Sequence, residues 1–375
     1  MLSPHEALVT LNLIPGLGSM RIQALLEVFG SAEHVLHAPE RLLAQVPRVG
    51  PKIAAAIADW RNCTNARAEL DCAAERGVRV VTLIDEEYPD FLRRMSDPPI
   101  VLYVRGNWLS SDSEHSVAIV GTRQASPYGA TTARRFGREL ADAGCTIISG
   151  LARGIDTAAH WGALDAGGRT IAVLGFGMAE LYPAENAELA DRICAGNGAL
   201  VSEFPMFMRP SRTTFPQRNR IVAAWSRATL VAEAPNRSGS LHTASLAAEY
   251  GNTVFAIPGP VTQINSSGCH ALIRDGATLC STPRELLSDM GWTQAPQQME
   301  LFDAPPLPPA PAPVRIPVTD DEASALLYAL DAGHDTLDAL CAATGKGAHC
   351  ITPLLMRLQI ERRIVPVPGG RFQRV

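Results

Sequence analysis

The sequence lacks the cysteine patterns that are typical of metal sites. Its eight cysteines contain no Cys-x-x-Cys pair, and no group of His and Cys residues has the spacing of a zinc site. We therefore expect no metal. Dispersed thiols without paired spacing fit a reducing compartment, so we expect these cysteines to be reduced.

The sequence also lacks the apolar segments that direct a protein to a membrane or anchor it there. It has no basic start followed by an apolar core and a small-residue cleavage site, and no apolar run approaches the length of a membrane span. Together with reduced cysteines, these absences predict a cytoplasmic protein with no membrane partner.

Positive charge is not in excess. The formal net charge of the 375 residues is −5, which excludes a uniformly basic nucleic-acid coat but not a local basic groove.

A hydrophobic content of 46% with 19% charged residues is ordinary for a soluble globular protein, and the chain is too long to form a single compact core. The expected segments are a helical domain over 1–78, an α/β domain over 79–292, a Pro-rich linker over 293–319 and a last domain over 320–375.

The first segment is predicted to form short helices and contains two similar hairpin-like stretches. Leu13-Ile-Pro-Gly-Leu-Gly18 and Val46-Pro-Arg-Val-Gly50 each precede apolar residues at helical spacing. This pattern is typical of a helix-hairpin-helix or a SAM-like bundle, and the turn amides of a helix-hairpin-helix can hold a DNA phosphate. Arg48 replaces the first glycine of the second stretch, so a helical bundle without DNA contact remains an open alternative.

From residue 79 the pattern changes to strands that alternate with helices. Short, continuous apolar runs separated by helical segments are typical of a parallel sheet covered on both faces. The order predicts an α/β fold with an extended Rossmann-like, doubly wound, mostly parallel sheet, whose ligand should lie at the carboxyl ends of the strands. The predicted strands cover residues 80–84, 100–104, 117–120, 146–148, 170–174, 199–202, 228–232 and 253–257.

Glycine is missing where a dinucleotide site would need it. Gly175-Phe-Gly177 lacks the third glycine because Glu180 stands in its place, and Gly121-Thr-Arg123 offers a single glycine. Gly345-Lys346 lacks the upstream glycine of a P-loop and lies outside the sheet domain. We therefore expect no nucleotide cofactor.

One turn has the features of a phosphate site. The stretch Ser149-Gly-Leu-Ala-Arg-Gly-Ile-Asp-Thr-Ala-Ala-His160 follows a buried strand and opens a helix. Gly150 and Gly154 let the backbone approach a ligand, the first helical amides are expected to lack partners, and Arg153 adds a fixed charge. Alternatively, Arg153 pairs with Asp156 and only caps the helix.

Three further segments, 121–123, 215–220 and 236–243, are expected to converge as loops at the same edge of the sheet. Arg218 and Arg220 flank Asn219, so the cations can reach phosphates while the amide contacts an oxygen or a base edge. Phe215 offers a stacking surface for an unpaired base, and Ser238-Gly-Ser240 precedes a helix as a second phosphate turn. Each residue alone also fits a structural role, but together they favour a single strand of nucleic acid.

No arrangement of residues indicates catalysis. The acidic candidates are Asp156, Glu203, Glu233 and Glu249, and no spacing makes two of them an acid/base couple. His160 has alanine neighbours on a predicted helix and is expected to be packed rather than reactive. We name no catalytic residue and expect a protein that is not an enzyme.

Beyond the linker, the pattern is that of a winged helix. Helices are predicted over 320–331, 336–344 and 348–361, and residues 364–374 alternate about a Gly-Gly turn as in a β-hairpin. Such modules bind DNA or dock proteins, and both uses remain open. The charges that DNA contact would use are Lys346, Arg357, Arg362, Arg363, Arg371 and Arg374.

With these motifs the chain resembles the DNA-processing protein A (DprA, or Smf) family. The resemblance covers the sheet domain in order, and the flanking segments also look like that family's modules. It implies a cytoplasmic protein that binds and protects single-stranded DNA and loads RecA recombinase during natural transformation. It also implies a homodimer formed through the sheet domain and no established enzymatic activity. It rests on Val117-Ala-Ile-Val-Gly-Thr-Arg123, the stretch 149–160, Tyr182-Pro183, Phe215-Pro-Gln-Arg-Asn-Arg220, Ser238-Gly-Ser240 and Pro258-Gly259 with Ser267-Gly-Cys269.

The resemblance and the turns described above define an expected DNA-binding site. Three nearby residues depart from the family pattern without altering the ligand class: Thr122 where Ser is common, His242 where Ile is common, and His270 where Asn is common. The expected DNA-binding residues are Gly121, Arg123, Ser149, Gly150, Arg153, Gly154, Phe215, Arg218, Asn219, Arg220, Ser238, Gly239 and Ser240.

Two alternatives accompany the leading hypothesis of a non-catalytic binder of single-stranded DNA. A nucleoside-monophosphate phosphoribohydrolase similar to the LOG family would share the sheet and a phosphate turn. That family has a Gly-Gly-x-Gly-Thr segment followed closely by a catalytic Glu, whereas here Ser238-Gly-Ser-Leu-His-Thr243 continues to Ala244-Ser245. The second alternative is an adaptor that acts mainly through the winged helix and the linker.

Overall fold

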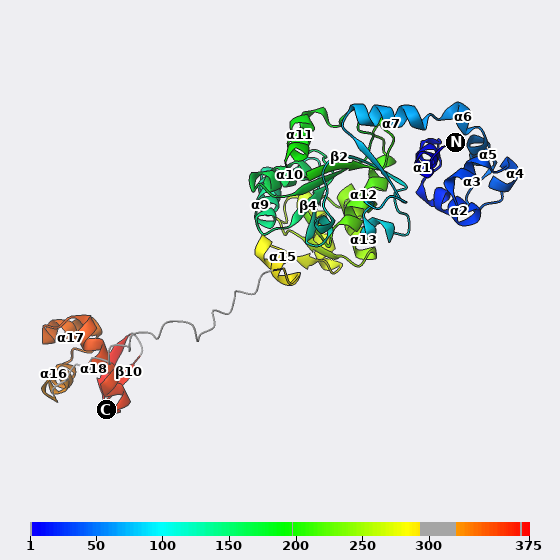
Figure 1. Cartoon of the computed structure of the whole chain (residues 1–375). Helices are drawn as coiled ribbons and strands as arrows, with labels where there is room; N and C mark the ends of the chain where they lie inside the picture. The colour runs from blue at the N-terminus through cyan, green and yellow to red at the C-terminus, as the bar shows by residue number, and fades with distance from the viewer. Residues whose placement is uncertain (1, 197, 293–319, 368–369) are drawn as a thin grey trace. The chain divides into compact units, whose positions relative to one another are not determined.

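The computed structural model describes residues 2–196, 198–292, 320–367 and 370–375 (Figure 1). The chain divides into two compact units, Met1–Ala295 and Pro296–Val375, and each is described by itself. The predicted Pro-rich linker lies outside the described residues, as does one glycine of the predicted Gly-Gly turn.

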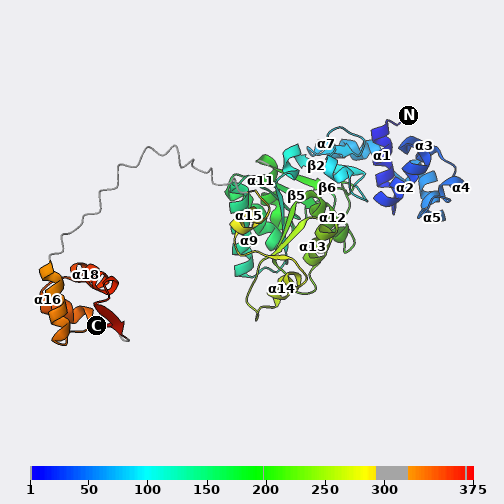
Figure 2. The same ribbon diagram turned by 90° about the horizontal axis from the view of Figure 1, so that it is seen from below.

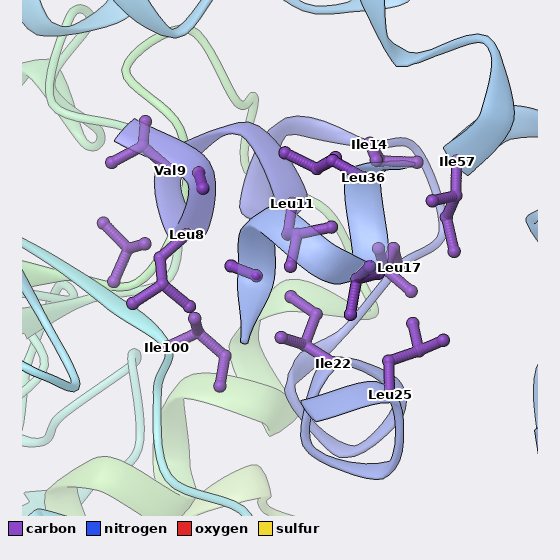
Figure 3. Close-up of a cluster of buried hydrophobic side chains, with 14 of the residues drawn as sticks. Leu8, Val9, Leu11, Ile14, Leu17, Ile22, Leu25, Leu36, Ile57 and Ile100 are labelled. Atoms are coloured by element: carbon purple, nitrogen blue, oxygen red, sulfur yellow. The ribbon is translucent and has the colours of Figure 1, made fainter. Parts of the chain in front are cut away.

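The first unit begins with short helices. Ser3 and Glu6 form a capping box at the start of α1, whereas Gly18 and Gly50 begin α2 and α5 without a side-chain cap. Buried leucines and isoleucines join these helices, and Ile100 from the sheet segment belongs to the same cluster, so the helices pack on the sheet (Figure 3). The helices are α1 Pro4–Leu13, α2 Ser19–Phe29, α3 Ala32–His37, α4 Glu40–Leu43, α5 Pro51–Ala58, α6 Trp60–Cys63 and α7 Ala66–Glu75.

A nine-stranded sheet of the described residues follows, in the order β1-β2-β6-β5-β4-β3-β7-β8-β9. From β6 to β9 across the sheet, neighbouring strands run parallel, and β1 and β2 are antiparallel additions at the β6 edge. The chain steps away from β3 in one direction through β4 to β6 and in the other through β7 to β9, so the connections after β3 and β7 diverge. The strands are β1 Arg79–Thr82, β2 Val101–Gly106, β3 Ser116–Gly121, β4 Thr146–Ser149, β5 Thr170–Leu174, β6 Gly198–Ser202, β7 Ala228–Glu233, β8 Thr253–Ala256 and β9 Thr278–Leu279.

Helices cover both faces of this sheet (Figure 1, Figure 2). Buried side chains join α9, α10, α11 and α15 to one face, and α8, α12, α13 and α14 to the other. The helices are α8 Asp90–Arg93, α9 Pro127–Asp142, α10 Ile155–Asp165, α11 Ala187–Ala195, α12 Thr214–Trp225, α13 Gly239–Glu249, α14 Ser267–Arg274 and α15 Pro283–Asp289, with 3-10 turns at Ser110–Ser113, Ala184–Asn186 and Ile264–Ser266.

This architecture confirms the predicted fold class, a Rossmann-like, doubly wound and mostly parallel sheet with helices before it. One local prediction was wrong: residues 215–220 form the first turns of α12 and not a loop. Pro216 lies in the first turn of this helix, where proline is tolerated because its missing N–H has no helical partner there. The buried residues Ile221, Val222 and Trp225 then hold the helix on the sheet.

The second unit is small and contains three helices and a hairpin among its described residues, as in a winged helix. Leu326, Leu340, Ile351 and Leu355 form its core. The elements are α16 Asp320–Asp331, α17 Leu337–Thr344, α18 Ala348–Ile360, β10 Ile364–Val367 and β11 Arg371–Arg374.

Across the described parts of both units, no helix combines the length and the apolar character that a membrane span requires.

Candidate nucleic-acid interface

A pocket of about 350 Å³ lies at the carboxyl ends of β3, β4 and β7. The connections after β3 and β7 diverge here, and ligands of open α/β sheets bind at such a point. The first turns of α12 and α13 complete its wall. The predicted residues that line it are Gly121, Arg123, Gly150, Phe215, Arg218, Asn219, Ser238, Gly239 and Ser240.

Arg218 is the buried cation of this pocket, with only 4% of its surface exposed. Its Nη1 donates to the carbonyl oxygen of Val173 at 2.7 Å, and its Nε has no hydrogen-bond partner among the described residues. Burial lowers the pKa of Arg218 to about 10, against the attraction of Asp156, so the guanidinium stays charged at neutral pH. A buried cation with an unsatisfied N–H is suited to an anionic ligand.

Gly150 makes room for this guanidinium. A side chain at position 150 would overlap Nη1 of Arg218. The sequence predicts that Gly150 lets the backbone approach a ligand, and the structure shows that the group it admits is a side chain of the same protein. Gly150 and Arg218 therefore depend on each other sterically.

The amides of the predicted phosphate turn already have a partner. The carboxylate of Asp156 accepts hydrogen bonds from the backbone N–H groups of Gly150, at 3.1 Å, and Ala152, at 3.4 Å. The first helical amides have partners too, since Ile155 N–H donates to the carbonyl oxygen of Thr122 at 3.3 Å and Thr157 N–H to that of Ala152 at 3.1 Å, so the expectation that they lack partners was wrong. Burial raises the pKa of Asp156, while Arg218 favours its charged form. The carboxylate of Asp156 is therefore the anion that the amides of this turn bind. A ligand phosphate would bind the arginines around the turn instead.

Arg123 and Phe215 form the exposed part of the site. The Arg123 Cζ atom lies 4.4 Å from the centre of the Phe215 ring, in the geometry of a cation–π contact. Arg123 is exposed and makes no ion pair with any residue that the structure describes. The pair presents a planar cation and a ring together at the pocket.

Phe215 also lines a second hollow of about 220 Å³, beside the first. This hollow contains Arg153 and Tyr182, and the Tyr182 ring centre lies 6.3 Å from that of Phe215. Arg153 forms an exposed, bidentate ion pair with Glu185 and none with Asp156, so the predicted alternative of a cap between Arg153 and Asp156 was wrong. The two hollows share Arg123, Gly150, Ala152 and Phe215.

The opposite wall is the start of α13. Ser238 caps this helix by accepting from the N–H of Ser240 at 3.3 Å, and Asn219 Nδ2 donates to the carbonyl oxygen of Gly239 at 3.4 Å. Arg212 lines the same pocket and is exposed, and it is not among the residues expected from the sequence. The only feature of the sequence that points to Arg212 is its position shortly before Phe215.

Three predicted residues lie outside both hollows. Ser149 is buried and donates to the carbonyl oxygen of Ile119 at 2.6 Å. Gly154 begins α10 with φ +78°, where a side chain would overlap the carbonyl oxygen of Thr122. Arg220 is buried and bonds to Asp97 at 2.8 Å and to Glu203 at 2.6 Å. Ser149 and Gly154 therefore support the structure of the turn without lining either hollow.

The remaining acidic candidates and His160 have structural surroundings. Glu233 accepts from the hydroxyl of Ser126 at 2.6 Å, Glu203 binds Arg220, and Glu249 is exposed. His160 is fully buried, and burial lowers its pKa to about 3. It is packed, as predicted. The described residues contain no group of three or more His, Cys, Asp or Glu that could hold a metal ion.

Most cations of the second unit are already paired with carboxylates. Lys346 binds Glu322, Arg374 binds Asp331, Arg357 binds Glu361 at 2.8 Å and Arg371 approaches Asp335 at 3.8 Å. A DNA contact by this unit would compete with these pairs.

Known proteins share both the sheet unit and the C-terminal unit. The family model described as DNA recombination-mediator protein A matches residues 79–291, more than half of the chain. The chain belongs to the DprA family. A DprA winged helix domain model matches residues 305–370, which confirms the prediction for the C-terminal unit.

Relatives of this DprA-family chain extend over nearly its whole length. Protein Smf of Synechocystis sp. is 33% identical over 384 residues, which cover 96% of each chain. The crystal structure of DprA from Streptococcus pneumoniae aligns with a TM-score of 0.64 at 32% identity and covers 77% of this chain and 98% of that one. DprA from Helicobacter pylori, whose structure concerns its single-stranded DNA binding mode, aligns with a TM-score of 0.51 at 30% identity over 57% of this chain and 95% of that one.

Proposed function

We propose that this protein binds single-stranded DNA through the pocket around Arg218 and the exposed pair of Arg123 and Phe215. The observation that carries the proposal is the combination of the Phe215 ring, stacked by Arg123 at 4.4 Å, with the buried guanidinium of Arg218 next to it. A ring can stack on any unpaired base, and guanidinium groups bind phosphate oxygens. The H. pylori relative, described for its single-stranded DNA binding, supports the same ligand class.

The shape of the pocket favours a single strand over a duplex. Phe215 lies between two hollows of about 350 and 220 Å³. A base must leave its pair and its stack before its face can meet the ring. We therefore expect duplex DNA to bind more weakly.

The charges support an anionic ligand. Among the described residues, Arg123 and Arg212 make no ion pair, and Arg153 is held only by an exposed pair with Glu185. Exposed ion pairs contribute little to stability, so a phosphate can replace Glu185 at small cost. Asp156 is the single carboxylate that lines the pocket, and it is engaged by Gly150 and Ala152.

We propose that DNA binding, and not catalysis, is the role of the site. The catalytic Glu of the LOG-like alternative has no counterpart after Thr243, and Asp156 is held by backbone amides. Incubation with nucleoside monophosphates should release no free base. Base release that disappears in an Asp156→Asn variant would contradict this part of the proposal.

We infer the biological setting from family membership. We propose that the protein protects incoming single strands and loads RecA on them in natural transformation, and that it acts as a homodimer. Support for the dimer comes from Val261, Ile264 and Leu279, which are 89%, 79% and 49% exposed near the β8 and β9 end of the sheet unit. A second copy would remove this apolar surface from water.

The test is a mobility-shift titration with oligothymidine and with a duplex of equal length. We expect tight, salt-sensitive binding of the single strand and weaker binding of the duplex. Equal affinity for both, or no binding of the single strand, would contradict the proposal.

A further inference from the structure

A larger groove of about 910 Å³ lies between the N-terminal helices and the sheet. One wall is the first hairpin-like stretch, residues 12–21, with Arg48 from the second. The opposite wall contains Gln217 and Arg220 of α12 and His242 of α13. Pro216 lines both this groove and the pocket around Arg218, so the two hollows meet at the start of α12.

The hairpin presents the start of a helix to the groove. Gly18 begins the 11-residue helix α2, lines the groove and provides no side-chain cap. A side chain at Gly18 would meet no atom within 4 Å, so there is room beside this helix start. The buried residues Leu17 and Ile22 hold the hairpin on its hydrophobic cluster (Figure 3). A fixed helix start of this kind favours an anion.

A second and independent feature is the state of Arg220. Its side chain is only 10% exposed and binds Asp97 and Glu203, yet its Nη1 has no hydrogen-bond partner among the described residues. Arg220 lines the groove together with both of these carboxylates. Asp97 Oδ2 and Glu203 Oε2 accept from Arg220, whereas Nη1 of Arg220 and Oε1 of Glu203 are buried without a partner among the described residues, so Nη1 can donate to a phosphate once the side chain turns toward the groove.

Two more arginines add positive charge that no carboxylate of the described residues neutralises. Arg21 donates to the carbonyl oxygens of Gly16, at 2.6 Å, and Arg48, at 2.9 Å, and so joins the two hairpin turns. Arg48 has φ +68°, a backbone conformation that glycine adopts more easily, and its side chain is exposed. Three arginines against Asp97 and Glu203 give the groove an excess of positive charge.

We propose that this groove binds the backbone of the same DNA strand, beyond the nucleotides held at Phe215. The start of α2, Arg48 and Arg220 would contact phosphates, and the exposed apolar residues Met20 and Met208 of the groove would contact bases. Both walls belong to one compact unit, so a strand that passes Pro216 enters the groove without leaving the surface. This inference rests on the proposed function.

Two substitutions test the groove without weakening the fold. Gly18→Asp places a carboxylate at the start of α2, which has no side-chain cap; Asp is a favourable N-cap, and its charge repels a phosphate. Arg48→Gly removes a cation and suits the positive φ of that position. The matched control is Gly50→Asp, which makes the same change at the uncapped start of α5, where a side chain also meets no atom within 4 Å and which lies outside the groove.

The measurement compares the full chain and its variants with oligothymidines of about 6 and about 30 nucleotides, the shorter one chosen to occupy the Phe215 site alone. Gly18→Asp and Arg48→Gly should each weaken binding of the long strand about fivefold or more and make it less salt-dependent, with binding of the short strand and the melting temperature preserved. Gly50→Asp should match the wild type with both.

Wild-type affinity of both groove variants for the long strand would overturn the inference, and so would an equal loss for the short strand. If the groove binds a peptide instead of DNA, both groove variants would bind the long strand with wild-type affinity. If the wild-type protein itself bound neither strand, the proposed function would fail, which is a different outcome from failure of the groove alone.

Discussion

Arg218 occupies the space that a side chain at position 150 would fill. The guanidinium comes from α12 and the glycine from the turn after β4, so the closeness of these two elements sets the shape of the pocket. The buried cation needs the glycine, and Arg218 favours the charged form of the Asp156 carboxylate in the same turn.

Gly150→Ala should therefore displace Arg218. Overpacking of a buried site costs about 1–3 kcal/mol, so we expect a loss of this size in unfolding free energy and weaker binding of oligothymidine. In an Arg218→Ala background the same change should cost much less, because the overlapping atoms are gone. Denaturant titration of the four proteins in this cycle measures the coupling. Gly50→Ala, where the added atom meets nothing within 4 Å and which lies outside the pocket, is the control.

Phe215→Ala should remove the stacking surface. Loss of one stacked base costs about 1–3 kcal/mol, which is about five- to 150-fold in affinity for a single strand. Phe215→Trp should retain most of the binding. Phe207 offers a matched control, because it is 64% exposed, Arg76 lies 5.7 Å over its ring, and it lines neither hollow. An equal loss in Phe207→Ala would contradict a specific role for Phe215.

Arg123→Gln should lower the salt dependence of binding. One lost phosphate contact reduces the slope of log K against log salt by about 0.7 for a single strand. The variant should also bind more weakly, because the planar cation above Phe215 is gone. Arg138→Gln is the comparison, since Arg138 is exposed on α9 and lies outside both hollows. An unchanged slope in Arg123→Gln would place the phosphates elsewhere.

The sequence predicts the architecture well because each parallel strand is a short apolar run bounded by a turn, as in Thr170–Leu174. It also identifies most of the pocket, since glycine and arginine turns cluster after these strands. It does not show that Asp156 holds the amides of Gly150 and Ala152, because that bond depends on how the turn closes. Long-range contacts, such as those of Arg220 with Asp97 and Glu203, are likewise invisible to local patterns.

Stability should also depend on pH through His160. Burial lowers its pKa from 6.5 to about 3, so between these values the unfolded chain binds a proton that the folded protein does not. The stabilisation is fully present above the unfolded pKa and is lost as the pH falls through about 3. His160→Asn should reduce the slope of unfolding free energy against pH by up to about 1.4 kcal/mol per pH unit between about pH 6 and pH 4.

Urea titrations at several pH values measure this slope. The wild-type protein, titrated under the same conditions, gives the reference slope. An unchanged slope in His160→Asn would show that His160 takes up a proton in the folded protein.

The most direct test of the pocket is photo-cross-linking with oligothymidine that carries 4-thiothymidine, followed by mass spectrometry of the cross-linked peptides. We predict cross-links to the peptide that contains Phe215, lost in Arg218→Ala and absent with a duplex probe. Cross-links that avoid Phe215 and the turns around Arg123 and Ser238, and fall instead on the C-terminal unit, would contradict the assignment of this pocket as the DNA site.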